Sequence, residues 1–239
     1  MEKQVNIAQY LDSTYLKTAK EVGLSELETK EMVVKLIHEA IQLKFACIMI
    51  RPEFVAMAKE IIESNKSKLK VGTVIDFPFG NNSTETKVEE AKSAIKNGAY
   101  DIDYVCDYNA FKRGSFEKFD HDIVEGSEIV LQSKRIVKWI IETGALSRDE
   151  IREIARRISE IIQVNFPQNS SKIFIKTSTG YYGGYGATAK DIKIIKSVAG
   201  NLQIKASGGV SNLKDCLDMI KAGATRIGTS KALLIYNEK

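Results

Sequence analysis

The sequence has few of the residues that interrupt or cross-link a chain. Only three prolines and three cysteines occur among 239 residues, and no low-complexity segment divides the chain. Three scattered cysteines are too few for a disulfide framework or a zinc site. Cys47, Cys106 and Cys216 are therefore predicted to be small buried hydrophobic residues in a reducing compartment. We expect one domain that spans residues 1–239.

Long apolar runs and concentrated basic runs are also missing. No segment approaches the ~20 apolar residues of a membrane span, and the N-terminal MEKQVNIAQYLDSTYL lacks the apolar core of a signal peptide. The 35 basic and 31 acidic residues are interspersed, without the basic footprint typical of nucleic-acid binding. We expect a cytoplasmic protein with no membrane or nucleic-acid partner, for which phosphorylated small molecules are better ligands.

The rest of the chain alternates between two patterns. Short apolar runs are followed by segments whose apolar residues recur at helical spacing, which predicts a parallel sheet, because parallel strands need a helix-sized connection. Eight such units in 239 residues fit a single α/β domain, a closed (β/α)8 TIM barrel with a short N-terminal extension. The alternative is an open doubly wound sheet, although no GxGxxG follows the first strand. The predicted strands are Tyr10–Asp12, Ala46–Ile50, Val71–Ile75, Asp101–Cys106, Val137–Glu142, Ile173–Thr177, Gln203–Ser207 and Arg226–Thr229.

Three charged residues interrupt these strands. Lys176 lies in IFIKTS, Lys205 in LQIKAS and Asp103 in DIDYV. A buried charge is costly, so such residues are rare unless they are paired or functional. Strand alternation places both lysines on the polar face, which points into the barrel. They also lie near the carboxyl ends of their strands, where barrel active sites are built.

The two lysines are 29 residues apart, which puts them on neighbouring strands. Repulsion between two ammonium groups and loss of solvent both lower a lysine pKa. A neutral lysine amine is the nucleophile that attacks an aldehyde or ketone to give a Schiff base. Asp103 is expected to pair with the lysine that stays charged and to take part in proton transfer. The alternative is a buried Asp–Lys ion pair with a spare lysine that reaches solvent.

Glycine and hydroxyl residues follow the last two predicted strands, in Ser207-Gly208-Gly209 and Gly228-Thr229-Ser230. Glycine permits a close backbone approach, and free N–H groups at a helix start bind anions. The loops after the seventh and eighth strands are a recurrent phosphate site in barrels. The paired clusters therefore predict a phosphate site.

These residues together resemble the deoxyribose-phosphate aldolase family. The segment IKTSTGYYGGYGAT resembles that family's Schiff-base strand and loop, and IKASGGV resembles its second-lysine strand. Further blocks follow in the family's order over almost the whole chain: LDSTYL, CIMIRPEFV, VIDFPFGNNSTETKVEEA, DIDYV, IIETG and ATRIGTS.

The resemblance implies a role for each candidate residue. Lys176 would form the Schiff base, Lys205 would lower its pKa, and Asp103 would be the acidic member of a proton relay. The implied substrate-binding residues are Asp12, Thr14, Thr177, Gly180, Gly208, Gly209 and Ser230. The implied reaction is reversible cleavage of 2-deoxy-D-ribose 5-phosphate to acetaldehyde and D-glyceraldehyde 3-phosphate, with no metal and no other cofactor.

Several alternatives stay open at this point. The chain could be a related lysine-dependent aldolase for another phosphorylated sugar, or an inactive barrel that binds a sugar phosphate. A homo-oligomer, dimer or tetramer, is compatible with the sequence. The resemblance leaves open whether Tyr236 acts as the C-terminal tyrosine that assists proton transfer in some members. Lys138 and Glu142 share a face of their predicted strand, where they either edge the site or pair with each other.

Overall fold

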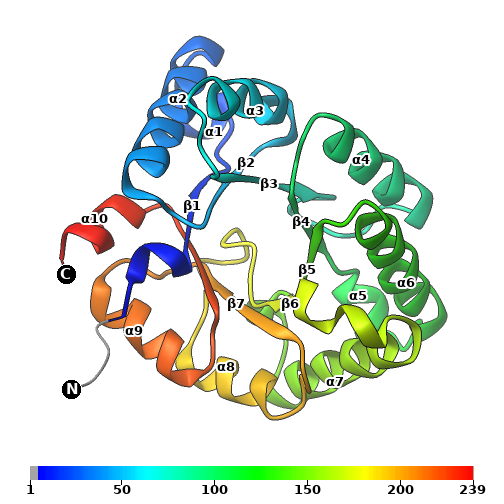
Figure 1. Cartoon of the computed structure of the whole chain (residues 1–239). Coiled ribbons are helices and arrows are strands. Elements are labelled where there is room, and N and C mark those ends of the chain that lie inside the picture. The colour runs from blue at the N-terminus through cyan, green and yellow to red at the C-terminus, as the bar shows by residue number, and fades with distance from the viewer. Residues whose placement is uncertain (1–4, 239) are drawn as a thin grey trace.

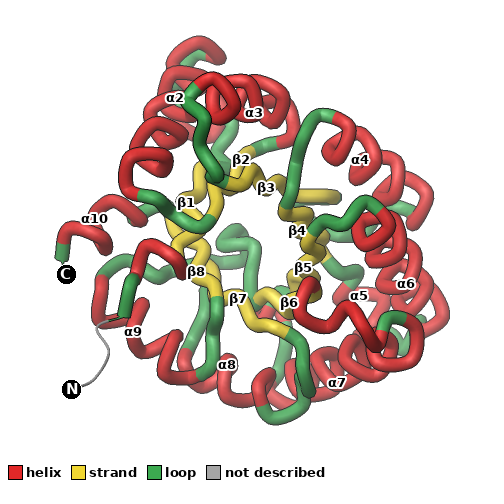
Figure 2. Tube along the Cα trace, viewed as in Figure 1, coloured by secondary structure: helices red, strands yellow, loops and turns green. Residues whose placement is uncertain are grey.

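The computed structural model describes residues 5–238, which form a closed barrel of eight parallel strands surrounded by helices (Figures 1 and 2). The strands pair in chain order, and β8 returns to pair with β1. The predicted (β/α)8 barrel is therefore confirmed. The strands are β1 (Leu11–Tyr15), β2 (Cys47–Ile50), β3 (Lys70–Ile75), β4 (Asp101–Val105), β5 (Ile136–Ile140), β6 (Ile173–Lys176), β7 (Gln203–Ser207) and β8 (Arg226–Thr229).

The helices form the outer ring in Figure 2. They are α1 (Ala19–Val22), α2 (Glu26–Leu43), α3 (Val55–Ser64), α4 (Thr84–Lys96), α5 (Tyr108–Lys112), α6 (Phe116–Gln132), α7 (Arg148–Asn165), α8 (Ala189–Lys196), α9 (Leu213–Ala222) and α10 (Ala232–Asn237). Short 3-10 turns lie at Ile7–Tyr10, Pro52–Phe54, Thr143–Ala145 and Pro167–Lys172. Within residues 5–238, no helix combines the length and apolar character needed to cross a bilayer.

Local sequence signals explain where the longest helices begin. Ser25 caps α2 by accepting a hydrogen bond from the Glu28 amide, and the Glu28 carboxylate accepts one from the Ser25 amide at 2.8 Å. The same reciprocal box opens α7, between Ser147 and Glu150. Each box satisfies backbone N–H groups that a helix start leaves without a partner.

Most predicted strand ends agree with the structure to within one residue, but the ends of the first and fifth strands are wrong by more. The first strand was predicted as Tyr10–Asp12, but β1 runs from Leu11 to Tyr15, because Tyr10 closes a 3-10 turn and the strand continues through the hydroxyl residues that follow. The fifth strand stops at Ile140, and Glu142 has a left-handed backbone with φ 56°. Lys138 and Glu142 therefore do not share a strand face.

The strand side chains that point outward form the main apolar core beneath the helices. Ile175 and Ile204 lie there, as the strand alternation predicts. The two largest fully buried side chains among the described residues are Tyr104 on β4 and Trp139 on β5, whose rings stack with centroids 4.6 Å apart. The indole N–H of Trp139 donates to Ser127 of α6 at 3.0 Å. This contact fixes α6 against the sheet.

The inside of the barrel is divided into two kinds of surface. On the side of β2 and β3 the interior is apolar, with Cys47, Met49 and Val74 in a small cluster of their own. On the other strands the interior side chains are mostly charged and buried, and this side forms the floor of the site described below.

Gly126 of α6 is predicted to be essential for the packing of this helix. A Cβ at this position would lie 2.7 Å from the Trp139 ring, which is fully buried and has no room to move. Overpacking of this kind costs about 1–3 kcal/mol, more than alanine gains in helix propensity. We expect Gly126→Ala to lower the midpoint of thermal unfolding by about 2–8 °C.

The matched control is Glu128→Ala, an exposed position two residues along the same helix. Its midpoint should stay close to that of the native protein. A Gly126→Ala protein as stable as this control would show that the Trp139 contact is not tight.

Candidate active site

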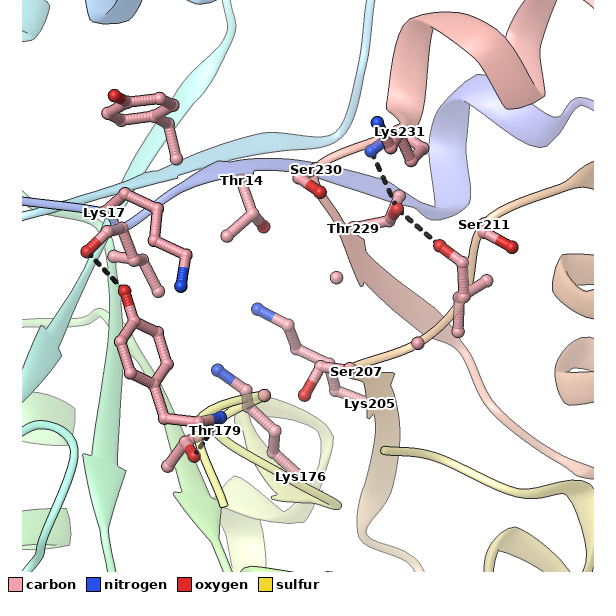
Figure 3. Close-up of a pocket in the computed structure, with 18 residues that line it drawn as sticks. Thr14, Lys17, Lys176, Thr179, Lys205, Ser207, Ser211, Thr229, Ser230 and Lys231 are labelled. Carbon is pink, nitrogen blue, oxygen red and sulfur yellow. Dashed lines mark hydrogen bonds between the residues drawn. The ribbon is translucent and has the colours of Figure 1, made fainter. Parts of the chain in front are cut away.

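A cavity of about 420 Å³ opens at the carboxyl ends of the strands (Figure 3). Its walls come from the loops after β1, β6, β7 and β8, and Lys176 and Lys205 rise from its floor. Figure 3 shows the two amines side by side and directed into the cavity. The lining residues at its mouth include Thr14, Lys17, Thr179, Gly180, Tyr181, Gly208, Gly209, Ser230 and Lys231.

Lys176 is the last residue of β6, and only 3% of this residue is exposed to solvent. Its ammonium nitrogen lies 2.9 Å from Asp103 Oδ2. Burial lowers the pKa of Lys176 most, Asp103 opposes this effect, and Lys205 adds to it, so that the pKa falls from 10.5 to about 8. A substantial fraction of this amine is therefore neutral near physiological pH.

Asp103 is shared between three lysines. Its Oδ2 atom lies 2.9 Å from Lys205 as well as from Lys176, and its Oδ1 atom accepts a hydrogen bond from Lys138 at 2.7 Å. Burial alone would raise the pKa of Asp103, but Lys138, Lys176 and Lys205 outweigh it and hold that pKa well below its ordinary value. Asp103 is thus a carboxylate at neutral pH.

The ion pairs continue below the cavity. Lys138 Nζ also lies 2.7 Å from Asp101 Oδ2, and Arg226 reaches the same oxygen at 3.2 Å. Arg226 donates to Asp12 Oδ1 at 2.7 Å through Nε. Lys205 Nζ lies 2.7 Å from Asp12 Oδ2 and so returns the chain of contacts to its start.

These contacts form a closed loop of alternating charges, which we call the ionic ring. Burial raises the pKa of Asp12, but the nearby cations outweigh it and lower the pKa to about 2. Burial lowers the pKa of Lys138, but its two carboxylates outweigh that effect and raise it. The members in order are Asp103, Lys138, Asp101, Arg226, Asp12 and Lys205.

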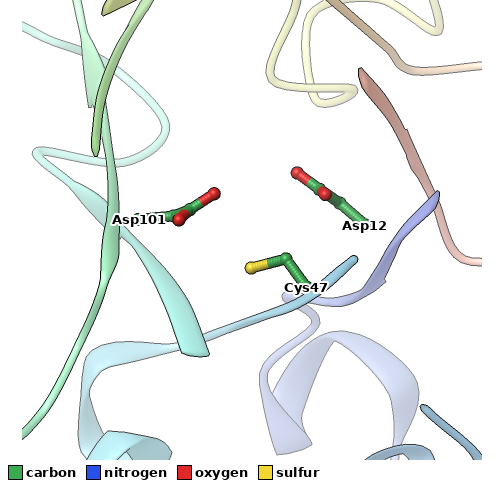
Figure 4. Close-up of side chains that lie close together, drawn as sticks. All are labelled: Asp12, Cys47 and Asp101. Carbon is green, nitrogen blue, oxygen red and sulfur yellow. The ribbon is translucent and has the colours of Figure 1, made fainter. Parts of the chain in front are cut away.

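Among residues 5–238, one group of potential metal ligands lies close together, formed by Asp12, Cys47 and Asp101 (Figure 4). Both carboxylates already hold cations of the ionic ring. Burial raises the pKa of the Cys47 thiol well above its usual value, so it stays protonated, whereas a metal ligand must be a thiolate. The group does not fit a metal ion.

The predicted phosphate residues meet at one wall of the cavity. Gly180, Gly208 and Gly209 all have φ between 75° and 82°, a left-handed backbone that favours glycine. The loops also touch, since a Cβ on Gly186 would lie 2.2 Å from the Gly208 carbonyl oxygen. Ser230 faces this wall from the loop after β8 (Figure 3). The glycines thus leave backbone room for an anion.

Not every predicted site residue reaches the cavity. Thr14 lines it, but Asp12 lies beneath it in the ionic ring. Thr177 is fully buried and donates to the Ser207 carbonyl oxygen at 3.1 Å, which ties β6 to β7. The ring of Tyr236 packs edge to face on Phe45 with centroids 5.8 Å apart, next to the start of β2 and away from the carboxyl ends of the strands.

Sequence reasoning missed part of the site. It left Lys138 between two roles and did not consider Arg226 or Asp101. The period-two pattern of a strand holds the missing signal, because Asp101 lies two residues before Asp103 and shares its face. Glu142 accepts hydrogen bonds from Thr179, at 3.2 Å from the Thr179 amide, so its role is to hold the loop after β6.

Comparison with known proteins agrees with this geometry. A family model described as DeoC/LacD family aldolase matches residues 16–234. The chain belongs to this aldolase family. The aldolase is 40% identical over 232 residues to the deoxyribose-phosphate aldolase of Staphylococcus saprophyticus, covering 97% of this chain and 96% of that protein. It is 37% identical over 232 residues to the enzyme of the same name from Thermococcus gammatolerans, and the match covers 97% of this chain and 95% of that protein.

Among solved structures, a tetrameric deoxyribose phosphate aldolase from Aeropyrum pernix matches with a TM-score of 0.79 and 25% identity. The match covers 97% of this chain and 89% of that one. The family resemblance seen in the sequence is therefore confirmed, and the chain is an aldolase of the lyase class.

Lys205 should control the protonation of Lys176 in this aldolase. Lys205→Met removes a like charge and leaves Asp103 more available to Lys176, so both effects should raise the Lys176 pKa above about 8. We expect the pH dependence of reductive alkylation at Lys176, followed by mass spectrometry, to move to more alkaline pH.

Lys231→Met is the matched control, since Lys231 lines the mouth of the same cavity but is exposed to solvent, where charges are screened. An alkylation midpoint that is the same in the native protein and in Lys205→Met would show that the two lysines are not coupled.

Proposed function

We propose that this aldolase reversibly cleaves 2-deoxy-D-ribose 5-phosphate to acetaldehyde and D-glyceraldehyde 3-phosphate through a Schiff base on Lys176. The observation that supports this most is the position of a buried lysine with a pKa of about 8 on the floor of a cavity that is lined on one wall by glycine backbone and the Ser230 hydroxyl. An aldehyde at one end and a phosphate at the other fit these two features. The names of the curated relatives point to the same substrate.

The reaction begins when the neutral Lys176 amine attacks the aldehyde carbon of the open-chain sugar. The carbinolamine that forms loses water to give a protonated Schiff base. Removal of the proton from the C3 hydroxyl then lets the C2–C3 bond break, and its electron pair moves into the iminium to form an enamine. Glyceraldehyde 3-phosphate leaves at this step.

The second half returns the enzyme to its starting state. The enamine takes a proton on its terminal carbon, and water hydrolyses the resulting iminium to acetaldehyde and free Lys176. Asp103 is within hydrogen-bond distance of both Lys176 and Lys205. Asp103 and Lys205 can therefore relay these protons together with water. Asp103 also stabilises whichever of the two lysines is charged.

We also propose a cellular location, a domain organisation and an assembly for this aldolase. The three free, buried cysteines are in keeping with a reducing cytoplasmic location. The pairing of β1 with β8 supports a single aldolase domain over residues 1–239. The tetrameric structure of the Aeropyrum pernix relative supports a homo-oligomer.

Lys176 should be the residue modified when the Schiff base is trapped. Treatment with acetaldehyde and borohydride should add a reduced two-carbon group to Lys176 alone, because Lys205 contacts two carboxylates and Lys176 contacts only one. Peptide mapping by mass spectrometry reads the site, and Lys176→Met should abolish the adduct. A dominant adduct on Lys205 would overturn the assignment, and no adduct at all would favour the inactive sugar-phosphate-binding barrel.

The phosphate should contribute to turnover as well as to binding. Backbone N–H groups at Gly208 and Gly209, with the Ser230 hydroxyl, are placed to hold the dianion, and remote binding can orient the reacting carbon. A charge-assisted hydrogen bond contributes about 1.5–3 kcal/mol, so two such contacts imply a loss on the order of a hundredfold in kcat/KM when the phosphate is absent. We expect 2-deoxyribose to be a poorer substrate by that factor.

Ser230→Asp tests the location of this site, because it places a carboxylate against the dianion. The change should lower kcat/KM for deoxyribose 5-phosphate and leave that for 2-deoxyribose almost unchanged, whereas Ser230→Ala is the uncharged control. Equal losses on both substrates would place the phosphate elsewhere. Failure of the native protein to act on deoxyribose 5-phosphate, with Lys176 still trapped by acetaldehyde, would favour a related aldolase for another phosphorylated sugar.

A further inference from the structure

The four cations at and beneath the floor of the cavity differ in the number of carboxylates that they contact. Lys138 contacts two carboxylates, those of Asp101 and Asp103. Lys205 likewise contacts two, and so does Arg226. Lys176 contacts only one carboxylate, through an oxygen that it shares with Lys205.

The charges of the ionic ring are balanced without Lys176. The ring contains three carboxylates and three cations, and every member touches two partners of opposite sign. A charged Lys176 is therefore one cation in excess. Because an excess charge is costly in a buried, low-dielectric interior, the lysine with the fewest carboxylate contacts is the one that gives up its proton.

We propose that Lys138, Asp101 and Arg226 are positioning residues that complete the ionic ring and thereby leave Lys176 as the surplus, neutral lysine. This inference rests on the proposed function, in which the Lys176 amine is the nucleophile. None of the three residues lines the cavity, so each acts through Asp103 or Asp12 rather than on the substrate.

Lys138 has the most direct effect. It occupies Asp103 Oδ1 at 2.7 Å, so Lys176 and Lys205 must both use Oδ2. Its stem is held by its position on β5, with the ammonium 5.8 Å from the centre of the Phe174 ring. Without Lys138, the Asp103 carboxylate has one oxygen for Lys176 and one for Lys205. Lys176 then no longer shares its oxygen with Lys205.

The groups around Lys176 on the other elements are consistent with this assignment. Strand β2 offers only the Cys47 thiol, whose pKa burial raises, and the inward face of β3 offers the apolar Val74. After β5, Glu142 is beyond ion-pair distance of Lys176 and is held by Thr179, and burial raises its pKa. Lys17 lines the mouth of the cavity and lies 4.4 Å from the centre of the Tyr181 ring. Lys231 also lines the cavity, from the loop after β8, and the ionic ring supplies the charges beneath the cavity.

The proposal predicts opposite shifts from two substitutions of adjacent ring members. Lys138→Met removes a ring cation, so a charged Lys176 is then required to balance the carboxylates. The pH midpoint for modification of Lys176 should therefore move to more alkaline pH by about 1 pH unit or more. Asp101→Asn removes a carboxylate, so the excess of cations grows and the midpoint should move acidic. The double variant removes both charges and should return the midpoint close to that of the native protein.

The measurement is the pH dependence of the rate at which acetaldehyde and borohydride modify Lys176, with peptide mapping to confirm the site. This readout does not require deoxyribose 5-phosphate, so it is independent of the sugar specificity. A native protein that gives no adduct at Lys176 would overturn the proposed function. A normal native adduct, with single variants that share one midpoint or move it in the same direction, would overturn only the ring proposal.

A general loss of structure gives a different result from a change in charge balance. A damaged site lowers the rate at every pH and is not repaired by a second substitution, whereas charge balance moves the midpoint and is restored in the double variant. Asn has the same shape as Asp, so Asp101→Asn is the main test variant if the Lys138→Met protein does not fold. In that case Arg226→Met should move the midpoint alkaline, because it also removes a ring cation, and an acidic or absent shift would contradict the proposal.

Discussion

The carboxylate of Asp103 touches three lysine ammonium groups at 2.7, 2.9 and 2.9 Å, and the rest of the site depends on this contact. A fully buried charge is tolerated only when it is paired, and here the pairing is unequal. Lys138 and Lys205 each have a second carboxylate, whereas Lys176 has none. The difference in partners, together with burial, explains why the pKa of Lys176, one of three chemically identical side chains, falls to about 8.

The closed barrel makes this arrangement possible. Residues far apart in the sequence, such as Asp12 on β1 and Arg226 on β8, meet because the last strand pairs with the first. Parallel pairing also brings the carboxyl ends of all strands to one mouth, so Lys176 and the glycine loops face the same cavity. The inward side chains of β2 and β3 are apolar and offer no partner to a charged group. The charged side chains inside the barrel are therefore concentrated on β4–β8 and β1.

The sequence was sufficient to predict the fold and to single out Lys176 and Lys205 as candidate site residues, because both predictions depend on local patterns. Alternation of apolar residues predicts strands, and a lysine inside such a strand is conspicuous. The strand ends were harder: β5 stops at Ile140 although Ile141 continues the apolar run, since the left-handed turn at Glu142 depends on its contact with Thr179. The partners of Lys138 could not be predicted either, because Asp101 and Asp103 reach it across a strand pair that only the register defines.

The two ends of the cavity follow different physical rules, and this has a consequence for how the site can vary. The floor is a set of buried charges in which each member depends on its neighbours, so a single substitution changes the protonation of others. The wall at Gly180, Gly208 and Gly209 depends on backbone conformation, and Ser230 and Lys231 at the mouth are exposed. Substitutions at the mouth are therefore expected to be less strongly coupled to Lys176 than substitutions in the ionic ring.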